Sequence, residues 1–149
     1  MKKVTLASVG ALILAGALPA AALQAHAAAP ESQAMLEQGS KWATDAPLRE
    51  GMEGIRARVA QLRAKDRFTI ADYRSLANAL DGRIAGIVAN CKLAPDADAS
   101  LHAVIGELNR GATEMRGRWP EPARGLHRAK EALEAYQRSF DHPGFRPVA

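Results

Sequence analysis

The feature that most constrains the fold is a repeated spacing of apolar residues. Four segments carry apolar side chains at steps of three and four, and short spacers rich in proline and glycine separate them. Side chains at these steps share one face of a helix, so each segment predicts an amphipathic helix of about 20 residues, or roughly 30 Å. The four apolar stripes are Leu48, Met52, Ile55, Val59 and Leu62; Tyr73, Leu76, Leu80, Ile84, Ile87 and Cys91; Leu101, Ile105, Leu108, Ala112 and Met115; and Leu126, Ala129, Leu133, Tyr136 and Phe140.

The spacers at 66–67, 92–94 and 117–120 are so short that each pair of successive helices must pack side by side and antiparallel. The sequence therefore predicts an all-α, up-down-up-down four-helix bundle over residues 44–141. No segment alternates in the way that strands require. A further short helix is expected from residue 31 to 42, within an arm at 28–43, and the tail at 142–149 is expected to be irregular.

Helix-start signals support these boundaries. Thr44 or Asp45 precedes Pro47, which suits the first turn of a helix. Thr69 is followed three positions later by Asp72, as in a capping box.

The N-terminus predicts export. Lys2 and Lys3 precede an apolar run from residue 4 to 18, and Ala25-His26-Ala27 has the small residues of a signal-peptidase site. A membrane-spanning helix needs about 20 apolar residues, and this run is shorter and ends at Pro19. We therefore expect a cleaved signal peptide at 1–27 and a periplasmic protein.

Charge and motifs exclude several classes of function. The net charge of +4 includes Lys2 and Lys3, and the remaining charges of both signs are interspersed. The chain has no block of basic residues that could follow a phosphate backbone, so nucleic acid is not an expected partner. No membrane contact is expected after signal cleavage. The chain has no paired carboxylates, nucleophile–base pair or phosphate loop, so we do not expect an enzyme.

The single cysteine of the chain carries the functional argument. One thiol cannot form an internal disulfide, so Cys91 is buried, joined to a second chain, or bound to another group. In the expected bundle, the first and third helices begin at the end where the second finishes. Met52 and His102 each lie about two turns into their helices, and Cys91 lies in the last turn of the second. These three side chains are therefore expected to converge on one layer of the core.

A thiol, a thioether and an imidazole form a soft donor set, which favours Cu(I) over Mg²⁺ or Ca²⁺. The sequence thus predicts a copper site of Cys91, His102 and Met52, with His142 as the candidate for a further ligand. Such a site would serve metal buffering, metal delivery or electron transfer with a periplasmic partner. The alternative is a structural or interaction protein, in which Met52 and Cys91 fill the core or Cys91 links a homodimer.

Two resemblances bear on this site. The stretch "APLREGMEGIR", with the exported four-helix layout, resembles the soluble periplasmic b-type cytochromes and cytochrome c-prime. That resemblance implies haem held by a methionine early in the first helix and a histidine late in the fourth. Met52 matches the methionine, whereas Gln137 and Arg138 stand late in the fourth helix. The absence of C-x-x-C-H excludes covalent haem, so haem b between Met52 and His102 remains an alternative.

The second resemblance covers residues 41–115. "KWATDAPLREGMEGIR" and "IVANCKLAPDADASLHAVIGELNRGATEM" are similar to a family of small periplasmic proteins of the DnrO type. The resemblance implies that the elements at Met52, Asn90-Cys91 and Leu101-His102 belong to one feature.

Overall fold

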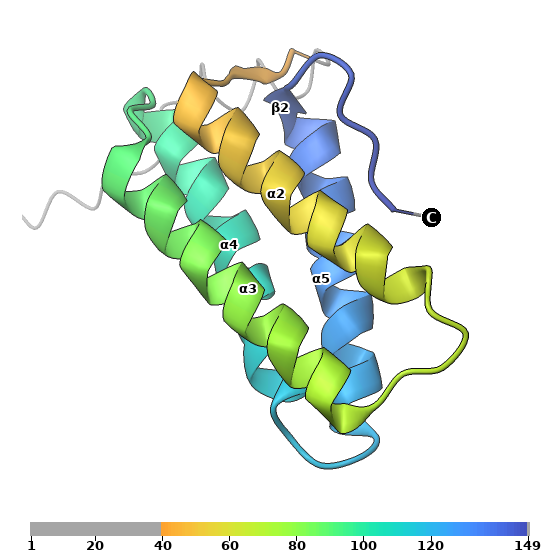
Figure 1. The fold of residues 1–149 in the computed structure, drawn as a ribbon. Coiled ribbons are helices and arrows are strands. Elements are labelled where there is room, and N and C mark those ends of the chain that lie inside the picture. Colours follow the sequence, from red (N-terminus) through yellow and green to blue (C-terminus); the bar gives the residue numbers. More distant parts are fainter. Residues whose placement is uncertain (1–39, 149) are drawn as a thin grey trace, which may run out of the picture.

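Four long helices lie side by side in the computed structural model, which describes residues 40–148 (Figure 1). The predicted all-α antiparallel four-helix bundle is confirmed. We call the end where the first and third helices begin the near end, and the opposite end the far end. The helices are α2 (Ala46–Arg63), α3 (Ile70–Asn90), α4 (Pro95–Met115) and α5 (Glu121–Ser139).

The helices begin where the capping residues predict. Asp45 is the N-cap of α2, and its Oδ1 accepts a hydrogen bond from the backbone N–H of Leu48 at 2.9 Å. Thr69 caps α3 in a reciprocal box with Asp72. Each cap pairs backbone donors that a helix leaves without partners in its first turn.

The core is built from the predicted stripes. Nearly all of the stripe residues are buried, and Cys91 alone among them lies only partly buried at the core's edge. Burial of such side chains supplies the main favourable term in folding. The largest side chains with almost no exposed surface are Tyr136, Phe140, Leu48, Met52, Ile55, Leu80, Ile87, Leu101, Leu108, Met115, Leu133 and Val59.

The helix pairs differ in how closely they approach. Contact is most extensive between α4 and α5 and sparse between α2 and α5. The α4–α5 contact depends on two glycines: a Cβ on Gly125 would lie 2.5 Å from the Gly111 carbonyl oxygen, and a Cβ on Gly111 would lie 2.8 Å from that of Gly125. The two helix backbones therefore meet without side chains between them.

The C-terminal segment closes the near end of the bundle. Strand β1 (Trp42–Ala43) pairs in parallel with β2 (Phe140–Asp141), with Trp42 opposite Phe140. Beyond β2, Phe145 is buried and its carbonyl oxygen accepts a hydrogen bond from Gln137 Nε2 at 3.2 Å. Residues 142–148 contain no helix or strand, and the buried Phe145 makes this segment part of the core.

Other expectations fall wholly or partly outside the described residues. The signal peptide at 1–27 and most of the arm at 28–43 lie there. Residues 40 and 41 have no regular structure and Trp42–Ala43 is a strand, so the last residues of the expected helix at 31–42 are not helical. Among residues 40–148, none of the helices has both the length and the apolar character needed to cross a membrane.

Candidate functional site at the near end

Cys91 lies where α3 ends. It is the C-cap of that helix, with extended backbone angles, and its N–H donates to the Ile87 carbonyl oxygen at 2.8 Å. Its side chain is a free thiol that is partly buried against the core. The thiol is therefore within reach of solvent at the near end.

Two carboxylates shape the electrostatics around this thiol. Burial raises the pKa of Cys91, and the negative charges of Asp45 and Asp98 raise it further. Asp45 is fixed in place because its Oδ2 accepts the backbone N–H of Lys92 at 2.6 Å while its Oδ1 caps α2. This environment favours the protonated thiol over the thiolate, and its negative charge attracts cations.

His102 does not lie in the core. Its Nδ1 is 2.8 Å from the Asp98 carbonyl oxygen and 3.5 Å from Asp98 Oδ2, and 69% of its side chain is exposed. The preceding residue, Leu101, faces the core at 1% exposure. One step along a helix turns the side chain by about 100°, so His102 faces away from the centre. The expectation that the imidazole shares one layer of the core with Cys91 and Met52 is therefore not met.

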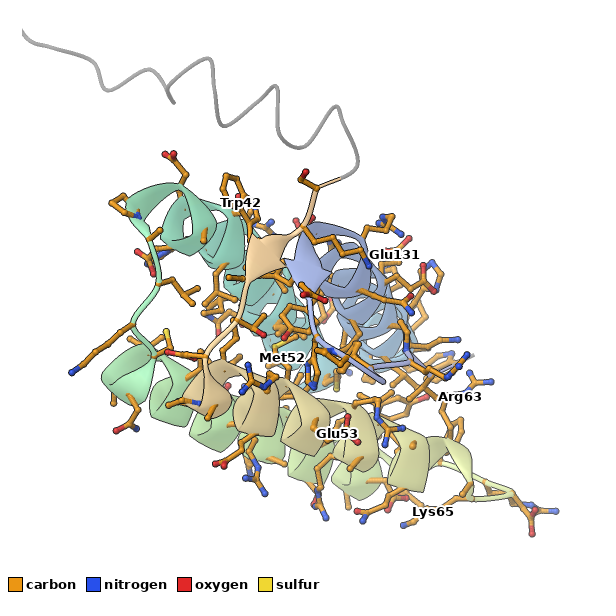
Figure 2. The ribbon with its side chains drawn as sticks, turned by 90° about the horizontal axis from the view of Figure 1, so that it is seen from above. Trp42, Met52, Glu53, Arg63, Lys65 and Glu131 are labelled. Atoms are coloured by element: carbon orange, nitrogen blue, oxygen red, sulfur yellow. The ribbon has the colours of Figure 1, made fainter. Side chains whose placement is uncertain are left out.

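Met52 lies at the opposite extreme of burial. It has no exposed surface and lies inside the bundle on α2 (Figure 2). The structure thus separates the three expected ligands by depth: Met52 in the core, Cys91 at its edge and His102 on the surface. Within residues 40–148, no group of three or more His, Cys, Asp and Glu side chains is arranged to hold a metal ion.

His142 belongs to a different cluster. Its Nδ1 is 3.0 Å from the hydroxyl oxygen of buried Tyr136, which stacks on Phe140 with ring centroids 5.1 Å apart. Phe145 lies edge-on to Tyr136 and 5.0 Å from the His142 ring. We call Tyr136, Phe140, His142 and Phe145 the near-end aromatic cluster. Sequence analysis missed it because the tail carries no helical or strand period.

The charges around His142 come from α2. Burial lowers the pKa of its imidazole, while Glu53 raises it and Arg49 lowers it. With its Nδ1 already engaged by Tyr136, His142 acts here as a packing residue of the C-terminal segment. The structure does not bring it together with Cys91 and His102 as a set of three ligands.

A surface cavity of about 390 Å³ adjoins the Cys91 corner. Trp42, Asp45 and Lys92 are among its lining residues. The indole N–H of Trp42 is buried and has no hydrogen-bond partner among residues 40–148. Because buried donors are normally paired, this N–H calls for a water molecule or another acceptor beside it.

Comparison with known proteins adds no identity to this site. The chain matches none of the protein-family models, none of the curated proteins and none of the solved structures with which it was compared. The resemblances to the DnrO-type family and to the periplasmic cytochromes therefore remain predictions.

Proposed function

We propose that this protein binds a soft metal ion, copper in its Cu(I) state, at the near end of the bundle, with Cys91 as the anchoring ligand. In the periplasm such a protein would buffer the metal, deliver it or pass electrons. The observation that supports the proposal is an accessible, unpaired thiol flanked by the carboxylates of Asp45 and Asp98. Thiolate sulfur is a ligand that selects Cu(I).

The carboxylates favour the metal for an electrostatic reason. The same negative charge that disfavours the free thiolate attracts a cation to the sulfur. A metal ion that coordinates the sulfur displaces the thiol proton. The carboxylates, which disfavour the free thiolate, then favour the metal-bound sulfur because they attract the metal's positive charge. Binding should therefore release one proton and weaken as the pH falls.

His102 is the second ligand in this proposal. It follows Asp98 by one helical turn on α4, and Asp98 is close enough to Cys91 to affect its pKa. Because the imidazole is mostly exposed, it can change rotamer without giving up core contacts. Met52 has no such freedom, since its sulfur is fully enclosed. The proposal consequently rests on Cys91 and His102, with Met52 as a core residue.

Haem b is less well supported than a single ion. Met52 has no exposed surface, so a haem bound to its sulfur would have to displace packed core side chains. His102 would also have to reverse its direction on α4. A Soret band after addition of haemin to the folded protein, absent in Met52→Leu, would favour haem instead.

A second candidate function is that of an interaction protein, and the accessible thiol favours it as well. A disulfide between two Cys91 thiols would join two bundles at their near ends. Non-reducing electrophoresis tests this: a species at twice the monomer mass that disappears in Cys91→Ser supports the linked dimer.

The decisive experiment is anaerobic titration with Cu(I) in the presence of a competing chelator. We expect one equivalent to bind, Cys91→Ser to abolish binding, and His102→Ala to weaken it by about tenfold or more. Met52→Leu should leave the affinity unchanged.

His127 on α5 provides the matched control. Its side chain is 72% exposed and its Nε2 lies 3.3 Å from Glu131, four residues on, so it repeats the histidine–carboxylate arrangement of His102 without a thiol. His127→Ala should bind Cu(I) like the unmodified protein. Binding that survives in Cys91→Ser, or that falls equally in both histidine variants, contradicts the proposal.

A further inference from the structure

The far end exposes large apolar side chains. Trp119, in the loop between α4 and α5, is 69% exposed, and Phe68 and Ile70, where α3 begins, are 40% and 38% exposed. Within the part of the chain that the structure describes, only one other large hydrophobic residue, Val88, is exposed to this extent. Exposed apolar groups gathered at one place mark a binding surface more often than the same groups scattered singly.

The same end carries the whole net positive charge of residues 40–148. The segments 63–74 and 114–128 contain eight Lys and Arg against four Asp and Glu. The remainder of the described chain contains ten of each and is neutral. The bundle is therefore electrically polarised along its axis, with the far end positive.

Five of these eight cations have no ion-pair partner among the described residues. Lys65, Arg116 and Arg128 form ion pairs with Asp72, Asp81 and with Glu107 and Glu114, respectively. The other five have neither an ion pair nor a side-chain hydrogen bond among residues 40–148, and all of them are exposed. They are Arg63, Arg67, Arg74, Arg118 and Arg124.

The exposed apolar groups and the cations share one tip of the molecule. The α2–α3 and α4–α5 loops both lie at the far end, as the antiparallel order requires (Figure 1). Arg63 and Lys65 lie at the opposite end of the ribbon from Trp42, which marks the near end (Figure 2). We call this tip, formed by residues 63–74 and 114–128, the far-end surface.

We propose that the far-end surface docks on the surface of an anionic lipid bilayer, with Trp119 and Phe68 entering the headgroup region and the unpaired arginines contacting lipid phosphates. Tryptophan is enriched where a bilayer meets water, because its ring is apolar and its N–H is polar. Each cation near an anionic membrane strengthens attachment by about fivefold. This goes beyond the metal-binding proposal and does not depend on it, since it uses the opposite end of the protein. It replaces the expectation, based on the charge pattern of the sequence, that the mature protein makes no membrane contact.

The shape and chemistry of the far-end surface favour a bilayer over a nucleic acid or an acidic protein. The two loops are separate projections, and a broad, deformable surface can contact both at once. Ile70 and Phe68 add exposed aliphatic and aromatic area, with which a charged phosphate backbone makes no favourable contact. A nucleic acid calls instead for a continuous basic groove lined with stacking rings.

Vesicle co-sedimentation tests the proposal, with phosphatidylglycerol vesicles compared against phosphatidylcholine vesicles at 0.1 M salt. We expect binding to the anionic vesicles only. Trp119→Ala should lower the affinity by about tenfold, and the exposed but distant Val88→Ala should leave it unchanged. All variants are made in the mature chain that follows the expected cleavage after residue 27, so the apolar run at residues 4–18 does not contribute to vesicle binding.

Charge reversal supplies a second, independent readout. The double variant Arg67→Glu/Arg118→Glu should weaken binding by about 25-fold or more, because two cations are lost. Arg83→Glu/Arg138→Glu makes the same change in net charge elsewhere on the bundle and should have a much smaller effect.

Several results would overturn the proposal. These are equal binding to both vesicle types, equal losses in the two charge variants, or tighter binding to a duplex RNA or to polyglutamate than to the anionic vesicles. Tryptophan fluorescence distinguishes true insertion from loose attraction: a blue shift on vesicle addition that persists in Trp42→Phe and is lost in Trp119→Phe is the expected result.

Discussion

The two ends of the bundle are built in different ways. At the near end, segments far apart in sequence meet: the α2 cap holds the backbone after α3, and the two short strands pair. The near-end aromatic cluster packs beside them. At the far end, a local capping box of Thr69 and Asp72 starts α3, and the loops present apolar and cationic side chains to solvent. The near end, which distant segments hold together, is where we propose that an ion binds. The far end, which is open to solvent, is where we propose that a bilayer binds.

The largest expected difference compares two phenylalanines. Phe145 is 5% exposed in the near-end aromatic cluster, whereas Phe68 is 40% exposed at the far end. We expect Phe145→Ala to lower the free energy of unfolding by about 3–5 kcal/mol, because it leaves a cavity in the core. Phe68→Ala should cost less than about 1 kcal/mol. Chemical denaturation measures the free energy of unfolding of both variants. Equal decreases would contradict the difference in packing between the two ends.

The next comparison contrasts two helix glycines. Gly125 meets the backbone of α4, so Gly125→Ala should destabilise the protein by roughly 1–3 kcal/mol through overpacking. Gly82 on α3 is exposed, and outside the adjoining backbone of its own helix a Cβ there would meet no atom of residues 40–148 within 4 Å. Gly82→Ala should therefore stabilise the protein by about 0.5–1 kcal/mol through helix propensity alone. Thermal denaturation should show a lower melting temperature for Gly125→Ala and a higher one for Gly82→Ala. A higher melting temperature for Gly125→Ala would contradict the close approach of α4 and α5.

The helix caps at the two ends should also differ. Thr69 makes a local cap at the far end, and its replacement by alanine should cost about 1 kcal/mol. Asp45 caps α2 and also accepts the N–H of Lys92, 47 residues away, so Asp45→Ala should cost about 1 kcal/mol more. Urea midpoints for the two variants test this ordering. Equal midpoints would show that the long-range bond contributes little.

Asp45 also links stability to thiol chemistry. Asp45→Asn keeps a side-chain oxygen for the cap but removes a charge that raises the pKa of Cys91. The thiol should therefore react faster with iodoacetamide at pH 8, because more of it is thiolate. An unchanged rate would show that Asp45 does not influence the sulfur.

The smallest expected effect is a pH dependence at the near end. Burial lowers the pKa of His142 below the usual value of about 6.5, so the folded state favours the neutral ring. This contribution is complete above pH 6.5 and is lost as the pH falls through that value toward the folded pKa. His142→Asn should flatten the decrease in melting temperature between pH 7 and 5. An unchanged decrease in His142→Asn would show that the buried imidazole does not contribute to it.

The sequence predicted the helices well because their signals are local. Apolar steps of three and four fixed the buried faces, and Asp45 and Thr69 marked two starts. The closing strands and Phe145 were not predictable in this way. Two-residue strands have no period. The burial of Phe145 depends on the tail folding back onto Tyr136 and Gln137 of α5, which no periodic pattern indicates.

The candidate site was predictable only in part. Helix order correctly placed the segments carrying Cys91 and His102 at the same end. Helix order did not predict the direction of the imidazole. His102 lies one residue from the buried stripe, and the 100° rotation of one helical step places its side chain on the surface. A stripe position such as Met52 likewise predicts burial and says nothing about whether the sulfur is accessible.

The central claim is that Cu(I) binds at the near end through Cys91. The most direct measurement is an amide ¹H–¹⁵N NMR spectrum of the uniformly labelled protein during anaerobic titration with Cu(I). The account predicts stoichiometric shifts, complete at one equivalent, centred on residues 45, 91–93 and 98–102, while residues 68–70 and 117–119 stay unchanged. An unaltered spectrum at one equivalent, or shifts centred at the far end, would contradict it.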